Sequence, residues 1–403
     1  MKMVIRTFSL LLLVMCSLSL NAGVIKGVVT DSLNHPLPFA TVWVDNHHTT
    51  TGIEGTFTLR NIEAGDRLLC VTYLGYSKKT DTIAVNNDTP AQCAIVMDEA
   101  RQVLPDLFVT PTGETIKQFL CRMVAENRKK LKDVVAHYDA KSTLHYEIDK
   151  DSAFSSIPKS MAGPFKFFLS MLGYGKVYNL NHDYPGLIVE LDQPINADKG
   201  NIKGGERTLA YVNKEIGKDE NDALMKLSGG LTENFYERIY RHFSTKKVKK
   251  MRQSEEKAEE RGEDIDADDS RLQYVGLYEE DGREIYVLKS NSAEVHIVDQ
   301  CWQIKCIKTT GKNGSSVCQC RELLPGVFLP VSFYSAVNLN FDDKGIFTKE
   351  LEEKRATDRS KMKPGDIAKL EREIAELERF ARHPVWELER TYTWDYTNII
   401  PAK

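Results

Sequence analysis

The sequence lacks a long apolar run beyond its N-terminal region, so it predicts no membrane-spanning helix. No stretch after residue 22 approaches the ~20 consecutive apolar residues that such a helix needs. The sequence also lacks a clustered basic excess, since 54 basic residues stand against 58 acidic ones, for a formal net charge of −4. Nucleic-acid-binding proteins usually concentrate positive charge, so we expect no nucleic-acid partner.

A zinc-peptidase motif is also lacking. None of the nine histidines is followed by a glutamate three residues later, although peptidases of the carboxypeptidase kind hold zinc with two histidines and a glutamate. His47 and His48 fall in an expected loop. No local cluster of acid, base and nucleophile is visible. We therefore expect no metal, no cofactor and no catalytic residue.

The first 22 residues have the pattern of a secretion signal. Lys2 and Arg6 precede an apolar run from Leu10 to Cys16, and Ala22 supplies the small residue that signal peptidase accepts. The residues before Cys16 loosely resemble a lipoprotein box, which leaves lipidation open, but Met15 is larger than the residue usual there. We expect cleavage after Ala22 and export to the periplasm or to the periplasmic face of the outer membrane.

Cysteine usage leaves two interpretations open. One of the eight cysteines, Cys16, lies in the signal, which leaves an odd number in an oxidising compartment. Cys306 and Cys320 lie on adjacent expected strands, so a disulfide between them is one interpretation. Ordinary buried thiols are the other. Zinc is not expected, because structural zinc sites usually offer cysteine pairs about two to four residues apart.

Residues 23–100 predict a small antiparallel β-sandwich, because short apolar runs alternate with turn residues. The expected strands are 24–30, 40–44, 56–59, 68–73 and 94–97. Gly55 suits a turn with positive φ. Phe57 and Leu59 are expected to point together into the sandwich.

Four strings in this stretch resemble the carboxypeptidase regulatory-like domain. They are Gly27-Val28-Val29-Thr30-Asp31, Pro36-Leu37-Pro38-Phe39-Ala40-Thr41-Val42, Gly55-Thr56-Phe57-Thr58-Leu59 and Tyr73-Leu74-Gly75-Tyr76. The resemblance implies a prealbumin-like sandwich of seven strands. Thr51-Gly52 stands where the family often has Thr-Asp, a departure that concerns the hydrogen bonding of one turn.

A linker and a long helix are expected next. Residues 101–113 contain Pro105, Pro111 and Gly113 and predict a linker to a second domain over 114–403. Glu114 to Ala136 is the clearest helix, with apolar residues at helical spacing, and Thr112 can cap its start.

The second half predicts a meander of strands. They cover 272–278, 283–289, 295–298, 302–308, 317–324, 331–341 and 385–396, with an amphipathic helix at 361–383. Asp281-Gly282 and Asn313-Gly314 supply hairpin turns. The expected fold class is mainly β with α, in which the sandwich is followed by an α+β domain of curved antiparallel sheet packed on a long helix. The segments 116–131 and 274–330 are similar to an uncharacterised family of envelope proteins.

Two further segments stand out by composition. Residues 154–175 are unusually apolar, and five of them are candidates for contact with lipid or an acyl chain: Phe165, Phe167, Phe168, Met171 and Leu172. The favoured alternative is a helix that covers the open sheet, because this segment lacks the basic excess of membrane-surface helices. Residues 244–271 are highly charged and predict a solvated helix or insertion.

Three functional hypotheses follow. The first is a non-enzymatic envelope protein whose sandwich is an interaction module and whose second domain binds an apolar ligand or a partner protein. The second is a hydrolase with a scattered site. The third is an accessory component of an outer-membrane TonB-dependent receptor system, in which the same module occurs. An apolar cavity between helix 114–136 and the sheet would favour ligand carriage, whereas a solid core would favour scaffolding.

Overall fold

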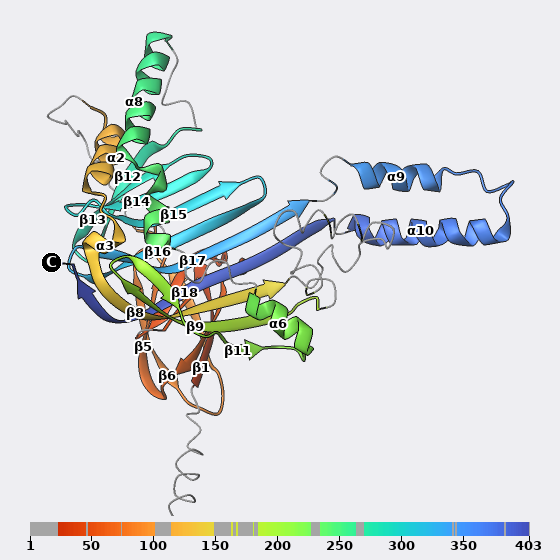
Figure 1. The fold of residues 1–403 in the computed structure, drawn as a ribbon, viewed down its shortest axis with the longest axis horizontal. Helices are drawn as coiled ribbons and strands as arrows, with labels where there is room; N and C mark the ends of the chain where they lie inside the picture. Colours follow the sequence, from red (N-terminus) through yellow and green to blue (C-terminus); the bar gives the residue numbers. More distant parts are fainter. Residues whose placement is uncertain are drawn as a thin grey trace, which may run out of the picture. The chain divides into compact units, whose positions relative to one another are not determined.

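The computed structural model describes residues 23–100 apart from 46 and 74, then 114–148, 184–226, 234–262, 270–340, 345–382 and 384–402, with 163, 167, 180 and 342 in addition. The chain divides into two compact units, Met1–Ala100 and Arg101–Lys403 (Figure 1). The predicted signal at 1–22 and the linker at 101–113 lie outside the described residues and stay predictions. The expected cap at Thr112 is wrong, because the helix that follows begins at Ile116 and is capped by Thr115.

The first unit contains seven strands in two sheets. They are β1 (Gly23–Asp31), β2 (Thr41–Val44), β3 (His47–Thr50), β4 (Thr56–Ile62), β5 (Gly65–Thr72), β6 (Lys79–Val85) and β7 (Ala91–Met97). One sheet has the order β4-β1-β7 and the other β3-β2-β5-β6. The two sheets confirm the expected sandwich of seven strands.

Alternating side chains form the core of this sandwich. Ile25, Val42, Phe57 and Leu59 are all buried there, so Phe57 and Leu59 point inward as expected. Gly55 has φ of +68°, and a Cβ atom at this position would lie 2.5 Å from the carbonyl oxygen of Val29. A side chain is therefore excluded at this turn.

Three details of the sandwich differ from the sequence-based expectation. His47 and His48 lie in strand β3, not in a loop. Strand β6 was not expected, because most of its residues are solvent-exposed and show no apolar alternation. The pair β1 and β7 is parallel, so the unit is not wholly antiparallel.

The second unit is built on one large antiparallel sheet of 11 strands. Its strands are β8 (Val135–Ile148), β9 (Ile188–Asp198), β10 (Asn201–Gly204), β11 (Thr208–Val212), β12 (Gln273–Glu280), β13 (Arg283–Lys289), β14 (Ala293–Val298), β15 (Ile304–Gly311), β16 (Gly314–Leu324), β17 (Val327–Asn340) and β18 (Val385–Pro401). The order is β10-β9-β8-β18-β17-β16-β15-β14-β13-β12, with β11 also on β9. The sheet curves (Figure 1), as expected from the sequence.

Both expected hairpins are present, but the second turn lies one residue earlier than expected, at Lys312-Asn313, because Gly314 pairs with Gly311. Asp281 and Gly282 join β12 to β13 with φ of +50° and +74°. Gly314 opens β16, where a Cβ atom would lie 2.1 Å from the carbonyl oxygen of Ala336 on the neighbouring strand. The turn residues in the sequence therefore predicted both of these hairpins.

Helices flank the sheet. They are α2 (Ile116–Asn127), α3 (Leu131–Val134), α6 (Lys218–Lys226), α7 (Phe235–Ile239), the 3-10 turn η2 (Tyr240–His242), α8 (Thr245–Glu260), α9 (Ile346–Arg355) and α10 (Pro364–Arg382). Figure 1 shows α9 and α10 side by side beyond the ends of β17 and β18. No helix in the described ranges is long and apolar enough to cross a membrane.

The expected single helix over 114–136 is wrong in its extent. Helix α2 ends at Asn127, and Arg128 has extended backbone. A short helix α3 follows, and β8 begins at Val135, which pairs with Pro401 at the end of β18. Residues from Val135 onward therefore pair in the sheet, although their apolar spacing alone would have continued the helix.

Candidate functional site

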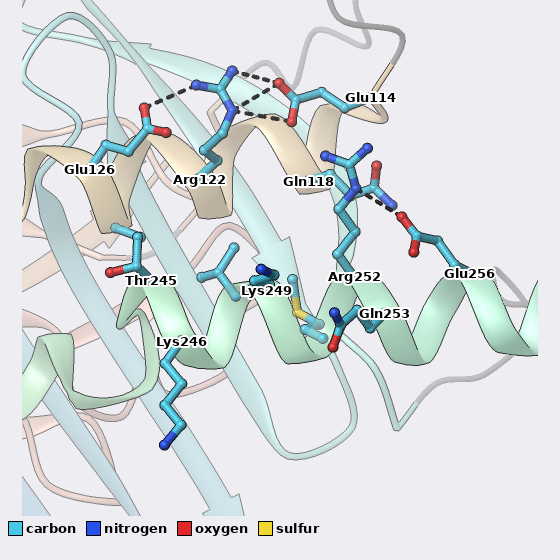
Figure 2. A pocket seen from close by; sticks show the side chains of 13 residues that line it. Glu114, Gln118, Arg122, Glu126, Thr245, Lys246, Lys249, Arg252, Gln253 and Glu256 are labelled. Atoms are coloured by element: carbon cyan, nitrogen blue, oxygen red, sulfur yellow. Dashed lines mark hydrogen bonds and ion pairs between the residues drawn. The ribbon is translucent and has the colours of Figure 1, made fainter.

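A groove lies between α2 and α8 in the second unit. Its volume is about 670 Å³. Five lining residues come from α2 and the residues before it: Glu114, Gln118, Arg122, Ala125 and Glu126. Eight come from α8: Thr245, Lys246, Val248, Lys249, Met251, Arg252, Gln253 and Glu256. Figure 2 shows the two helices with these side chains between and around them.

Helix α2 forms one wall of the groove, and its N-terminus is capped. Thr115 accepts a hydrogen bond from the backbone N–H of Gln118, and the Gln118 side chain bonds back to the backbone of Thr115. This capping box satisfies two amide groups that the first turn leaves open. Leu120, Cys121 and Val124 are buried, so Arg122 and Glu126 are left on the groove side.

A buried ion pair attaches α8 to α2. Nζ of Lys117 lies 2.9 Å from Oε1 of Glu255, with 7% and 3% of the two side chains exposed. The Gln118 side-chain amide donates to Oε2 of Glu255 over 3.1 Å. Burial and the nearby Glu255 raise the pKa of the Cys121 thiol to about 12. Most described residues of α8 are exposed, as expected of a solvated helix within 244–271, but Glu255 and Ala258 are buried.

The charges in the groove are unevenly partnered. Arg122 donates to Glu114 and to Glu126, each over 3.0 Å, and these bonds raise its pKa. Nε of Arg252 donates to Glu256 over 3.1 Å. Lys246 and Lys249 meet no carboxylate within the parts of the chain that the structure describes. The three carboxylates of the groove are thus engaged by arginines, while two lysines stay available.

Sequence reasoning missed this groove, although a signal was present. Val248, Met251, Glu255 and Ala258 recur at helical spacing, which is the pattern of a packed face. A glutamate in that stripe and the surrounding lysines hid the pattern. The partner helix lies more than 100 residues earlier in the chain, so no local motif could predict their contact.

The space between α7 and the sheet is nearly filled. Phe235 of α7 packs on Phe333, Tyr392 and Trp394, with ring centroids 4.6, 5.8 and 5.0 Å away. The cavity left around this cluster is about 20 Å³, which is room for about one water molecule. Among the described residues beside α7, the sheet is therefore covered by a packed core.

Most of the predicted lipid-contact residues cannot be placed. Phe165, Phe168, Met171 and Leu172 lie outside the described residues. Phe167 has helical backbone and is 68% exposed. The contact surface over 165–172 therefore stays a prediction.

The structure does not form the disulfide considered between Cys306 and Cys320. Both thiols are free and buried. The strand register places Gln319, not Cys320, opposite Cys306. Among the described residues, no cluster of cysteine, histidine and carboxylate side chains could hold a metal ion. The alternative of ordinary buried thiols matches these contacts.

A buried polar network on β12 and β14 is the nearest arrangement to a catalytic cluster. The hydroxyl of Tyr278 lies 3.0 Å from Nδ1 of His296, and Nε2 of His296 lies 3.0 Å from Oε1 of Glu294. Cys306 stands opposite His296 in the neighbouring strand, but burial raises the pKa of its thiol well above the usual value. Both ring nitrogens already have partners, so this network is a structural element of the sheet.

Comparison with known families identifies the first unit. Residues 25–109 match the CarboxypepD_reg-like domain. The first unit is a CarboxypepD_reg-like domain. This match confirms the resemblance carried by Gly27–Asp31 and Pro36–Val42. It ends at residue 109, near the start of the second unit. The similarity of the second unit to an envelope protein family stays a prediction. No curated protein matches the chain.

Proposed function

We propose that the chain is a non-enzymatic, exported envelope protein that binds a partner protein through the α2–α8 groove. CarboxypepD_reg-like domains are often β-sandwich interaction modules, and the second unit would add a second binding surface. The observation that carries this proposal is the groove itself, with its apolar floor and its two available lysines. Its volume lies within the roughly 300–1,000 Å³ of typical binding sites.

A partner protein is favoured here over an enclosed apolar ligand. The aromatic cluster around Phe235 leaves a cavity of only about 20 Å³, whereas carriage of an acyl chain requires an apolar chamber. The groove is a surface feature between two helices, and such grooves commonly receive a segment of another protein. The secretion pattern of Lys2, Arg6 and the run 10–16 supports the proposed export.

Site-specific photo-crosslinking tests the binding proposal. A photoreactive residue at Gln253, which lines the groove, should give one crosslinked product in intact envelopes, and mass spectrometry identifies it. Ser254 is the matched control, because it is also polar and exposed on α8 but does not line the groove. The product should disappear when Val248 in the floor is replaced by Asp. An outer-membrane receptor as the product would favour the accessory role.

Two outcomes contradict the proposal. Equal products from positions 253 and 254 would show that contact is not specific to the groove. Retention of the product after Val248→Asp would show that the groove floor is not used. Export is tested separately, because N-terminal sequencing of the mature protein should begin at Gly23; a mature chain that keeps Met1 would refute it.

A further inference from the structure

We infer that the α2–α8 groove accepts an acidic amphipathic helix, so that the partner contributes a helical segment with apolar residues on one side and carboxylates beside them. This inference rests on the proposed function and names the class of partner segment. It follows from the length of the groove, the chemistry of its lining and the partnering of its charges.

The groove has the length of a short helix. Its lining on α8 runs from Thr245 to Glu256, which at about 1.5 Å per residue corresponds to about 16 Å, or three turns. On α2 the lining follows one face, with Gln118, Arg122 and Glu126 four residues apart. Two helices that border one elongated groove offer the packing surface that a third helix uses in a bundle.

The lining is mixed by residue type, although most of the surface that it presents to the groove is apolar. Three of the 13 lining residues are apolar, namely Ala125, Val248 and Met251, and the rest are polar or charged. Small-molecule and lipid sites are lined mainly by hydrophobic side chains. An amphipathic helix instead needs a narrow apolar floor with polar borders, because its apolar residues recur about every three to four positions. Ala125, Val248 and Met251, with charged residues beside them, match that requirement.

The charges select an acidic segment. Glu114 and Glu126 are bound by Arg122, and Glu256 by Arg252. Lys246 and Lys249 are exposed and meet no carboxylate in the ranges that the structure describes. Both lie in the first half of α8, where the helix dipole is positive and lysine is unfavourable. Carboxylates of a bound segment would relieve this repulsion, whereas a basic segment would increase it.

Defined peptides test this inference on the mature chain. The first probe is a labelled amphipathic peptide of about four helical turns, with leucines at helical spacing and glutamates beside them. Its twin carries lysine in place of every glutamate. Fluorescence anisotropy should show at least tenfold tighter binding of the acidic peptide, and its affinity should fall as salt is added, because exposed charge pairs are screened.

A matched pair of variants locates the binding. The double variant Lys246→Glu/Lys249→Glu should weaken binding of the acidic peptide about tenfold or more. The control Lys247→Glu/Lys250→Glu makes the same charge change on the same helix at exposed positions that do not line the groove, and should weaken binding less than threefold. All four positions are exposed, so circular dichroism should show unchanged folding.

Each remaining outcome decides the question. Equal affinity for the two peptides, or equal loss in both double variants, would overturn the inference about charge while leaving groove binding in place. Displacement of the acidic peptide by micromolar dodecanoate, a single-chain anionic amphiphile, would favour a lipid-like occupant and overturn it too. If neither peptide binds and Gln253 gives no crosslinked partner, the proposed function fails as well.

Discussion

Lys117 and Glu255 stand 138 positions apart in the sequence, yet their charged atoms lie 2.9 Å apart in a nearly dry contact. This pair joins α2 to α8 and so builds the groove. Helix α8 is otherwise a weak helix, because its lysines lie toward its N-terminal end and its glutamates toward its C-terminal end, against the helix dipole. The position of α8 therefore depends on tertiary contact more than on its own helical propensity.

Removal of one member of the Lys117–Glu255 pair should destabilise the α8 contact. Glu255→Leu leaves Lys117 buried without its counter-charge, which typically costs about 3–5 kcal/mol. The double variant Lys117→Met/Glu255→Leu should lie within about 1 kcal/mol of the natural chain, since it buries no charge. Hydrogen exchange of the α8 amides measures the local opening. An equal loss in the single and double variants would contradict this account.

The Thr51 hydroxyl should stabilise the sandwich unit. It donates to the carbonyl of Leu37 over 2.6 Å and accepts from the N–H of Ala40 over 2.8 Å, and Thr51 is fully buried. Thr51→Val keeps the shape but leaves two backbone groups unpaired, at a cost of about 1–3 kcal/mol each. Thr51→Ser keeps the hydroxyl and should lose much less. Thermal unfolding of the first unit distinguishes them; similar losses in both variants would refute the role of the hydroxyl.

His296 should make stability fall in acid. Burial lowers the pKa of His296, although the hydrogen bond to Glu294 acts in the opposite direction. Because the folded pKa lies below the unfolded value of about 6.5, this contribution is present above that pH and is lost as pH falls toward the folded pKa. Urea unfolding between pH 5 and 8 should show a steeper acid loss in the natural chain than in His296→Gln. Identical pH profiles of stability for the two proteins would contradict this prediction.

His145 should act in the opposite direction. Burial lowers the pKa of His145, but an ion pair with Glu147 and a hydrogen bond with Glu190 outweigh that effect and raise it to about 9. The stabilising contribution is therefore complete below the unfolded pKa of about 6.5 and is lost as pH rises toward 9. The difference in unfolding free energy between the natural chain and His145→Gln should shrink from pH 6 to pH 9.5. A difference that grows over this range would contradict the prediction.

Local patterns predicted much of the fold. Asp281-Gly282 marked the first hairpin turn correctly, because a two-residue turn depends on backbone conformations that few residues adopt. Asn313-Gly314 marked the second hairpin, whose turn lies one residue earlier. Phe57 and Leu59 were placed correctly in the core, because alternation along a strand is a purely local property. Strand β6 was missed for the same physical reason, since a mostly exposed edge strand leaves no apolar alternation in the sequence.

Errors arose where distant contacts override local preference. Val134 and Val135 continue the apolar spacing of the helix before them, but pairing of Val135 with Pro401 draws the chain into the sheet. The charged segment of α8 has the composition of a solvated surface. Whether Glu255 faces water or a buried lysine depends on Lys117, which composition cannot reveal.

The sequence by itself determined many of the strands, the two hairpins and the sandwich family, because each depends on residues within one short segment. The secretion signal at residues 1–22 is also a local pattern, and export stays a prediction. Only the tertiary structure decided that α8 packs on α2, that the core beside α7 is nearly filled and that Cys306 faces Gln319. These features depend on which distant segments meet. The local sequence around a charged or apolar residue is the same whether that residue is buried or exposed in the fold.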